Sequence, residues 1–210
     1  EKQNIKIVEK NGIKIAFVSF NQYVNGVTYQ KKLPYMINFH ESTMMENMKK
    51  ARENADIVIV SCHWGIEYDY YPNTFQKNMA KQLADAGADV IIGTHPHTLQ
   101  DVEYIQRADG KRTLVAYSLG NFVSGMLEES CQLEGMLSFD IEKKKIKNVV
   151  FTPLVNYYTL TGKRERHDFS VYRLKDYTNK LVEKHGFPNL TIPYMKEEVK
   201  QKVKNIKIDM

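Results

Sequence analysis

Three histidines stand at the ends of two predicted β-strands, where side chains can meet around a metal ion. His63 comes two residues after the apolar run 56–61. His95 and His97 form a His-Pro-His motif shortly after the apolar run 89–92. Imidazole is a common ligand of zinc, iron and related ions. The pattern therefore predicts a metal site built from these three histidines.

The His-Pro-His spacing predicts that both imidazoles face one side. The residue before a proline favours an extended backbone. In an extended segment residues i and i+2 point the same way, so His95 and His97 should present two imidazoles to one ion. Gly93 precedes the motif and is expected to let the backbone turn. A single histidine at a strand end is as often a structural residue, so the joint placement with His63 carries the interpretation.

Two acidic residues follow His63 closely. Glu67 and Asp69 could be metal ligands, could support a ligand, or could act as acid–base groups. Asp69 is more typical of a loop charge, whereas Glu67 is the candidate for moving a proton beside a catalytic His63. Three histidines do not complete a two-metal hydrolytic centre, which also needs a bridging carboxylate and further oxygen ligands.

A predicted β-α-β unit positions these side chains. Residues 56–61 and 89–92 are apolar on both faces, as in strands buried between layers. Between them, residues 73–86 place Phe75, Met79 and Leu83 near helical spacing, and Gly87 is suited to end that helix. A crossover of this kind makes the two strands parallel and close neighbours. Their ends then meet at the sheet edge where open α/β sheets bind ligands.

The remaining segments suggest further strands and helices. Hairpins are predicted around Asn11-Gly12, around Asp109-Gly110 and around a charged turn between 136–141 and 149–154. Residues 21–40 read as loop. Ser42 is expected to begin a helix that packs Met44, Met45, Met48 and Ala51. Helices are also predicted over 173–185 and 196–203.

Composition bounds the class of protein. The 210 residues favour one domain, and an apolar share of 42% is ordinary for a globular core. No apolar run is long enough to cross a membrane, and the first residues do not resemble a signal peptide. The net charge of +5 gathers partly in 143–147 and in the last 15 residues. These runs are interpreted as solvated surface, with weak attraction to an anionic polymer or membrane surface, and not as a nucleic-acid site. Cys62 and Cys131 could pair, but nothing requires it.

Three motifs together resemble a known family. They are Ser61-Cys62-His63-Trp64-Gly65-Ile66-Glu67-Tyr68, then residues 93–100 with the sequence GTHPHTLQ, and residues 117–122 with the sequence YSLGNF. In this order and spacing they are similar to the bacterial capsule synthesis proteins known as CapA or PgsA. That family is linked to poly-γ-glutamate capsule production and resembles calcineurin-like metallophosphoesterases. The resemblance covers roughly residues 5 to 155.

The resemblance implies a fold and a set of roles. It implies the C-terminal portion of a metallophosphoesterase-like α/β/β/α sandwich over residues 1–160, and we expect a helical extension over 161–210. Two divalent ions are implied in the complete protein, with manganese, zinc or iron as suitable metals. His63 and His95 would share one ion, His97 would bind the other, and Gly120 and Asn121 would form a loop near the site.

The sequence also departs from the family. The family pattern opens with an aspartate-bearing strand, a glutamate-containing segment and an Asn-His motif, and none of these occurs here. The missing residues would supply the bridging carboxylate. The chain could therefore be a fragment, could receive the first half of the site from a separate chain, or could have lost the site.

Three functions follow as hypotheses. The first is a metal-dependent hydrolase-like enzyme of capsule synthesis, acting on a phosphoester or an amide-type bond. The second is a non-catalytic envelope component that binds or guides an anionic polymer, together with a capsule synthase complex. The third is a phosphoesterase for a small metabolite. Placement in the cell envelope or on its outer face follows from the family resemblance alone.

Overall fold

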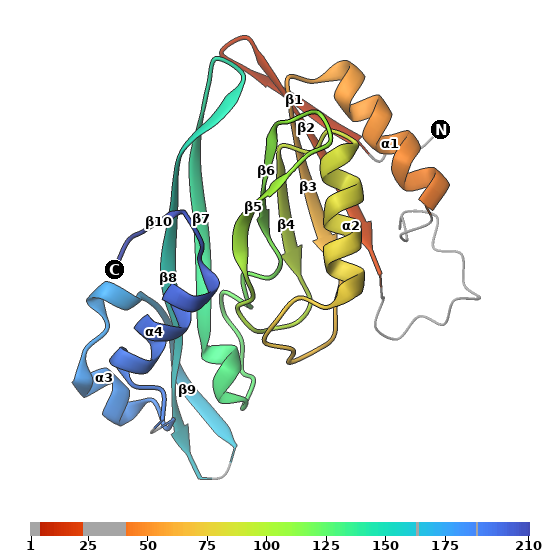
Figure 1. The fold of residues 1–210 in the computed structure, drawn as a ribbon. Helices are drawn as coiled ribbons and strands as arrows, with labels where there is room; N and C mark the ends of the chain where they lie inside the picture. The colour runs from red at the N-terminus through yellow and green to blue at the C-terminus, as the bar shows by residue number, and fades with distance from the viewer. Residues whose placement is uncertain (1–4, 23–40, 163, 188) are drawn as a thin grey trace.

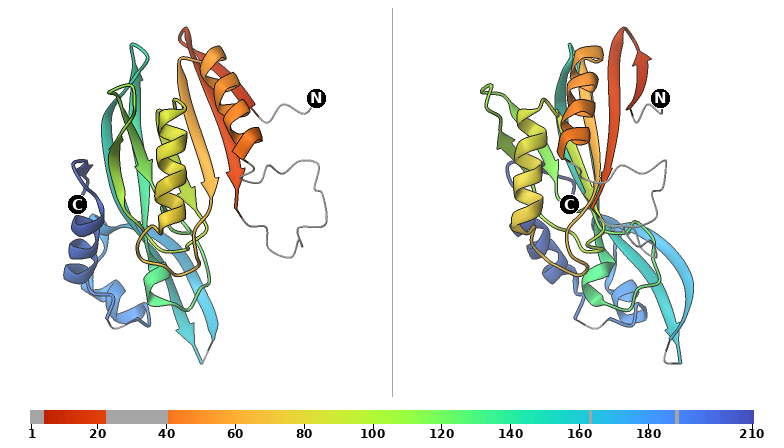
Figure 2. Two further views of the ribbon diagram at one scale, coloured as in Figure 1. Left: turned by 45° about the vertical axis from the view of Figure 1, so that its right-hand side comes forward. Right: turned by 90° about the vertical axis from the view of Figure 1, so that its right-hand side faces the viewer.

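The computed structural model describes residues 5–22, 41–162, 164–187 and 189–210, which form two β-sheets and four α-helices (Figure 1). The first sheet has six strands in the order β1-β2-β3-β4-β6-β5, and the second contains β7, β8, β9 and β10. Helices cover one face of the first sheet, and the second sheet lies against its other face (Figure 2). The mixed α/β class that the sequence predicts is confirmed.

The centre of the first sheet is parallel. β2 (Ile13–Asn21), β3 (Ile57–His63), β4 (Val90–Thr94) and β6 (Arg112–Ala116) run in one direction. β1 (Ile5–Lys10) and β5 (Val102–Gln106) pair antiparallel at the two edges. The hairpins predicted around Asn11-Gly12 and Asp109-Gly110 are confirmed, and the first turn has the positive φ angles that such a turn needs.

Two helices cover the first sheet. α1 (Glu41–Asn54) begins at Glu41, so Ser42 lies inside the helix and does not cap it as predicted. Met44, Met48 and Ala51 are buried as expected, whereas Met45 is exposed. α2 (Thr74–Asp85) begins after Asn73, whose side chain forms a reciprocal capping box with Gln76. Gly87 follows this helix with a φ of +104° and ends it as predicted.

The second sheet is built on one long strand. β8 (Lys145–Thr161) pairs with β7 (Leu133–Glu142) on one side, and with β9 (Glu165–Arg173) and β10 (Lys207–Ile208) on the other. The third predicted hairpin is therefore confirmed, with longer strands than the apolar runs suggested. Its turn consists of Lys143 and Lys144, both at positive φ.

The C-terminal part differs from the prediction. The helix expected over 173–185 is only α3 (Asn179–Lys184), preceded by the 3-10 turns of Leu174–Asp176. Before it lies β9, a strand in a region expected to be helical. Residues 165–173 take the strand form because they pair antiparallel with the long strand β8. The basic helix predicted over 196–203 is present but begins earlier, as α4 (Ile192–Lys202).

The tail packs into the same core as the sheets. One cluster of buried side chains joins the first sheet, the second sheet and α4; among its members are Leu99, Val102, Ala116, Leu133, Phe151, Val155, Met195, Val199 and Val203. The burial of these apolar side chains stabilises the packing of α4 against the two sheets. The division at residue 160 stays a prediction, although both sides of it share this core.

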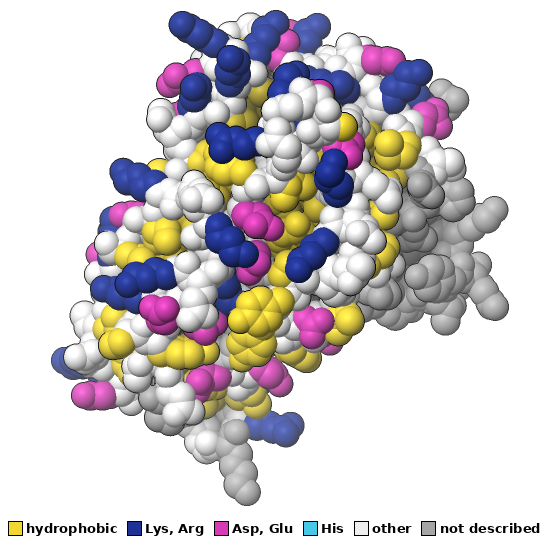
Figure 3. Space-filling model, in the orientation of Figure 1, with side chains coloured by type: hydrophobic (Ala, Val, Ile, Leu, Met, Phe, Trp, Pro, Cys, Tyr) yellow, Lys and Arg dark blue, Asp and Glu magenta, His cyan; other side chains and the backbone are white. Residues whose placement is uncertain are grey.

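Three further predictions concern the loop over 21–40, a disulfide and a membrane span. Most of the loop predicted over 21–40, including His40, lies outside the described residues. Cys62 and Cys131 are both buried and free of any disulfide. Among the described residues, no helix is both long enough and apolar enough to cross a membrane. Basic side chains gather at the upper end of the molecule, where the turns of the β1–β2 and β7–β8 hairpins lie (Figure 3).

Candidate metal centre

The carboxyl ends of β3 and β4 bring the three histidines together. The strands are parallel neighbours, and His63, the last residue of β3, pairs with Thr94 of β4. His95 follows directly. The ring centroids of His63 and His95 are 4.5 Å apart, and those of His95 and His97 are 6.0 Å apart. The convergence predicted from the β-α-β unit is therefore present.

The backbone that achieves this convergence is not the predicted one. His95 has a φ of +100° and His97 a φ of +64°, so the His-Pro-His segment is folded and not extended. Such conformations cost roughly 1–3 kcal/mol each in a non-glycine residue and persist where the surroundings impose them. Tyr68 and Phe122, each adjacent to a site residue, also have positive φ. Four residues in or beside the site thus have a backbone conformation that side chains rarely adopt.

Glu67 completes a group of potential ligands. One ligand atom each from Glu67, His95 and His97 lies within 4.8 Å of the other two. Glu67 Oε1 is 3.9 Å from His97 Nε2, which is too long for a hydrogen bond. Zinc binds imidazole nitrogen and carboxylate oxygen at about 2.0–2.2 Å each, so one ion could contact both atoms across this gap. These side chains fit a divalent metal.

His63 and Asp69 stand differently from this group. The imidazole of His63 is beside that of His95, yet His63 is not part of the three-residue group. Asp69 contributes its backbone carbonyl, which accepts hydrogen bonds from Thr98 and Gln100, and its carboxylate is not in the group. The roles predicted for His63, as a ligand and as a catalytic residue, stay predictions.

Asn121 sets the tautomer of the His97 ring. The amide nitrogen of Asn121 donates to the backbone carbonyl of His97 at 3.3 Å. Its amide oxygen therefore faces His97 Nδ1, 2.6 Å away. An amide oxygen only accepts, so Nδ1 carries the proton and Nε2 keeps its lone pair. That lone pair is directed to the side on which Glu67 lies, as a metal ligand requires.

Gly120 and Glu134 support the Asn121 loop. Gly120 has a φ of +81°, and a Cβ at this position would lie 3.0 Å from Glu134 Cγ. Burial raises the pKa of Glu134 to about 8, while the nearby backbone N–H groups of Asn121 and Phe122 act in the opposite direction. A carboxyl group thus packs directly behind the loop that contacts His97.

The imidazoles of His63 and His95 lie in surroundings that favour their neutral form. Burial, followed by the neighbouring His95 and His97, lowers the pKa of His63. Burial also lowers the pKa of His95, although the charge of Glu67 acts against it. Metal ions bind neutral imidazole, so these environments suit ligation near neutral pH.

Gly93 does not form a turn as predicted; its lack of a side chain leaves room for neighbouring groups. It lies within β4, and a Cβ there would be 1.9 Å from the carbonyl oxygen of Tyr117 and 2.4 Å from Trp64 Nε1. The missing side chain lets the buried indole of Trp64 donate to the Tyr117 carbonyl at 2.9 Å. Trp64 directly follows His63, so this contact anchors the end of β3.

Polar side chains that the residue-by-residue interpretation missed hold the Glu67 loop. Thr98 Oγ1 donates to the carbonyl of Asp69 at 2.6 Å, and Gln100 Nε2 donates to the carbonyls of Asp69 and Tyr71 at 2.9 and 3.2 Å. Gln76 in turn donates to Gln100 Oε1 at 2.8 Å. The signal in the sequence was the placement of Thr98 and Gln100 inside the motif that contains His95 and His97.

A family model and two curated relatives match the chain. The model, described as bacterial capsule synthesis protein PGA_cap, matches residues 1–126. Capsule biosynthesis protein CapA of Bacillus anthracis is 37% identical over 126 residues, which are 58% of this chain and 29% of that protein. PGA biosynthesis protein CapA of Bacillus subtilis is 32% identical over 154 residues, which are 73% of this chain and 39% of that protein. The chain therefore spans less than half the length of these relatives.

Solved structures show more distant similarity. NAD nucleotidase of Haemophilus influenzae matches with a TM-score of 0.40 at 14% identity, over 98% of this chain and 34% of that one. A protein of Staphylococcus aureus described as a 5′-nucleotidase matches with a TM-score of 0.45 at 11% identity, over 92% of this chain and 33% of that one. Both scores lie below 0.5.

Proposed function

The chain belongs to the family of bacterial capsule synthesis proteins PGA_cap, and on this premise we propose that it serves capsule polymer biosynthesis through a metal-dependent, hydrolase-like site. The observation that carries the proposal is the group of Glu67, His95 and His97 at the carboxyl edge of the parallel sheet. Membership of the family supports a role in capsule synthesis, and the three side chains support metal-dependent hydrolysis.

Each residue of the group has a separate task in this proposal. Asn121 holds the proton on His97 Nδ1, so Nε2 is free to bind a divalent cation. His95 and Glu67 supply the other two ligand atoms. His63, beside His95, would be a further ligand or would exchange a proton with the reacting group. A bound cation would act as a Lewis acid that polarises a phosphoryl or carbonyl oxygen and activates water.

The proposed substrate and setting follow from the family. We propose an anionic polymer of the poly-γ-glutamate type, or a phosphoester precursor, as the molecule acted on. A capsule synthase complex in the cell envelope would be the setting, and the remaining ligands of a two-metal centre would come from a segment outside these 210 residues.

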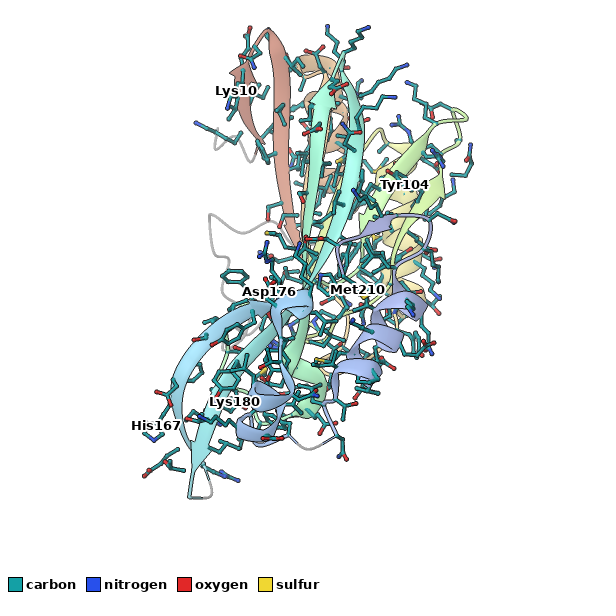
Figure 4. The ribbon with its side chains drawn as sticks, turned by 90° about the vertical axis from the view of Figure 1, so that its left-hand side faces the viewer. Lys10, Tyr104, His167, Asp176, Lys180 and Met210 are labelled. Carbon is teal, nitrogen blue, oxygen red and sulfur yellow. The ribbon has the colours of Figure 1, made fainter. Side chains whose placement is uncertain are left out.

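The test is polymer output from a producing strain that lacks the native gene and carries a variant. His97→Ala should abolish output because it removes a ligand atom, while the protein stays folded. His167→Ala is the matched control, since His167 lies on the β8–β9 hairpin, away from the first sheet (Figure 4). Full output from the His97→Ala strain, with folded protein present, would contradict the metal-dependent function.

A non-catalytic role in binding the polymer is the second candidate. Exposed lysines lie in and beside the turns of the β1–β2 and β7–β8 hairpins, and these are Lys10, Lys143, Lys144, Lys145 and Lys147. Basic side chains gather at this upper end of the molecule in Figure 3. Such a surface attracts an anionic polymer in a salt-dependent way. Output that survives His97→Ala but falls on replacement of Lys143 and Lys144 by glutamine would favour this role.

A further inference from the structure

Lys202, at the end of α4, carries a buried ammonium group. Its side chain is 3% exposed, although lysine is almost never fully buried without a partner. The nearest carboxylate, that of Glu198, is 4.0 Å away, so an ion pair alone does not explain the burial. Burial lowers the pKa of Lys202, and the charges of Glu198 and Asp101 oppose that shift. A further contact must therefore stabilise the buried ammonium group.

That contact is with the loop that carries Glu67. Lys202 Nζ donates to the backbone carbonyl of Tyr70 at 2.7 Å. It also lies 4.5 Å from the ring centroid of Tyr71 and 5.5 Å from that of Tyr70, within the range of cation–π attraction. A charged donor to a carbonyl is stronger than a neutral one, and more so away from water.

Three successive backbone carbonyls of the Glu67 loop, those of residues 69–71, accept hydrogen bonds from side chains. The carbonyl of Asp69 accepts from Thr98 and Gln100, and that of Tyr71 accepts from Gln100. The carbonyl between them, that of Tyr70, accepts from Lys202. Thr98 directly follows His97 and Gln100 lies two residues further on, so these hydrogen bonds join the Glu67 loop to the His95–His97 segment.

The helix that carries Lys202 is itself fixed to the first sheet. Val203 forms a parallel bridge with Val102, the first residue of β5. The backbone N–H of Lys204 donates to the Val102 carbonyl at 2.9 Å, and Lys204 Nζ contacts Asp101 at 2.8 Å. Lys202 therefore reaches the loop from a rigid support.

We propose that Lys202 is a positioning residue that holds the loop of residues 66–71, and with it the Glu67 carboxylate, against His95 and His97. The inference rests on the proposed function in taking Glu67 as a ligand. It assigns a task in that site to the C-terminal segment, which lies beyond the residues 1–126 matched by the family model. Lys202 acts through the backbone and touches no reacting atom.

The test compares Lys202→Met with Lys200→Met, which removes an exposed lysine from the same helix. The readout is exchange of the Tyr68 amide, whose N–H donates to the Pro96 carbonyl at 2.8 Å across the two segments. Loss of a charged hydrogen bond should raise the exchange rate about tenfold or more in Lys202→Met. The amides of β3 should exchange as in the unsubstituted protein, and Lys200→Met should change neither.

A second variant keeps the test decisive where Lys202→Met fails to fold. Tyr71→Leu removes the nearer of the two aromatic rings beside Lys202. Tyr71 is 62% exposed, so this variant should fold and raise Tyr68 exchange by a smaller factor. Unchanged Tyr68 exchange in these variants, or an equal rise at every amide, would overturn the proposal. Manganese titration of the longest form of the protein separates the two proposals: if the unsubstituted protein binds none, the metal function fails, while Tyr68 exchange still decides the role of Lys202. If it binds, Lys202→Met should bind about tenfold more weakly, and unchanged affinity would refute the positioning of Glu67.

Discussion

At the scale of single residues, the two nitrogens of His97 have different tasks. Nδ1 is held by Asn121 at 2.6 Å, and Nε2 lies 3.9 Å from Glu67 Oε1. Orientation of a ligand histidine by a second hydrogen bond is a general feature of protein metal sites. Asn121 was expected near the site from the family resemblance, and its contact with His97 gives it a physical reason to be there.

Removing the Asn121 amide should therefore weaken metal binding without removing a ligand. Asn121→Leu leaves the imidazole in place but lets Nε2 carry the proton, so we expect a 10- to 100-fold loss of manganese affinity. Isothermal titration measures this. Asn148→Leu, which removes an exposed amide from strand β8 of the second sheet, is the control. An affinity equal to that of the unsubstituted chain would show that Asn121 does not set the His97 tautomer.

The sequence predicted which residues meet but not how the backbone brings them together. His63, His95 and His97 converge because parallel strands end at one edge, and apolar runs reveal such strands. The left-handed conformations of His95 and His97 depend on contacts made by Tyr68, Asn121 and Trp64, which come from other segments. Local rules for the residue before proline could not include those contacts.

At the scale of elements, the end of β3 is anchored through a position in β4 that has no side chain. Gly93 leaves room for the Trp64 indole and the Tyr117 carbonyl to meet. The buried runs, the hairpin turns and the helix end at Gly87 could be predicted because each has a local signature, whereas Ser42 proved not to be a cap. β9 was missed because its strand form depends on β8, and the role of Gly93 was missed because the crowding comes from β3 and β6.

A methyl group at Gly93 should damage the site edge severely. In Gly93→Ala the new Cβ would overlap the Tyr117 carbonyl, so we expect the free energy of unfolding to fall by about 3 kcal/mol or more. Urea denaturation measures the change. Gly125→Ala is the control, because the nearest atom there belongs to the flexible side chain of Arg166, and its effect should stay within about 1 kcal/mol. Equal stability of Gly93→Ala and the unsubstituted protein would contradict the packing argument.

At the scale of the whole molecule, the C-terminal residues contact both sheets and the site loop. α4 shares a core with both sheets, and Lys202 and Lys204 bond to the site loop and to the start of β5. The predicted division into a domain and a helical extension rested on where the family resemblance stops. Only the tertiary packing shows that the two parts are joined at the site.

His185, which packs against the rings of Tyr157, Tyr158, Tyr177 and Phe187, should make stability depend on pH. Burial lowers the pKa of His185 to about 4 from its usual 6.5. The unfolded chain then binds more protons between these values, so stability is complete above pH 6.5 and is lost as the pH falls toward 4. We expect unfolding at pH 5 to cost about 2 kcal/mol less than at pH 7.5 from this residue.

The comparison of His185→Phe with the unsubstituted protein isolates that effect. Tyr177 loses its hydrogen bond to His185 Nδ1 in the variant, so the variant should be less stable at pH 7.5. It should nevertheless lose less stability than the unsubstituted protein between pH 7.5 and pH 5. Chemical denaturation at both values measures the difference, and parallel loss in the two proteins would refute the assignment to His185.

The central claim is that Glu67, His95 and His97 hold a divalent metal, and the most direct test is the metal content of the purified protein by mass spectrometry. The chain is loaded with manganese, zinc or iron and compared with the His95→Ala, His97→Ala double variant and with His167→Ala. We predict bound metal in the unsubstituted protein and in His167→Ala, and its loss in the double variant. Equal metal content in all three proteins, or none in the longest form of the unsubstituted protein, would contradict the claim.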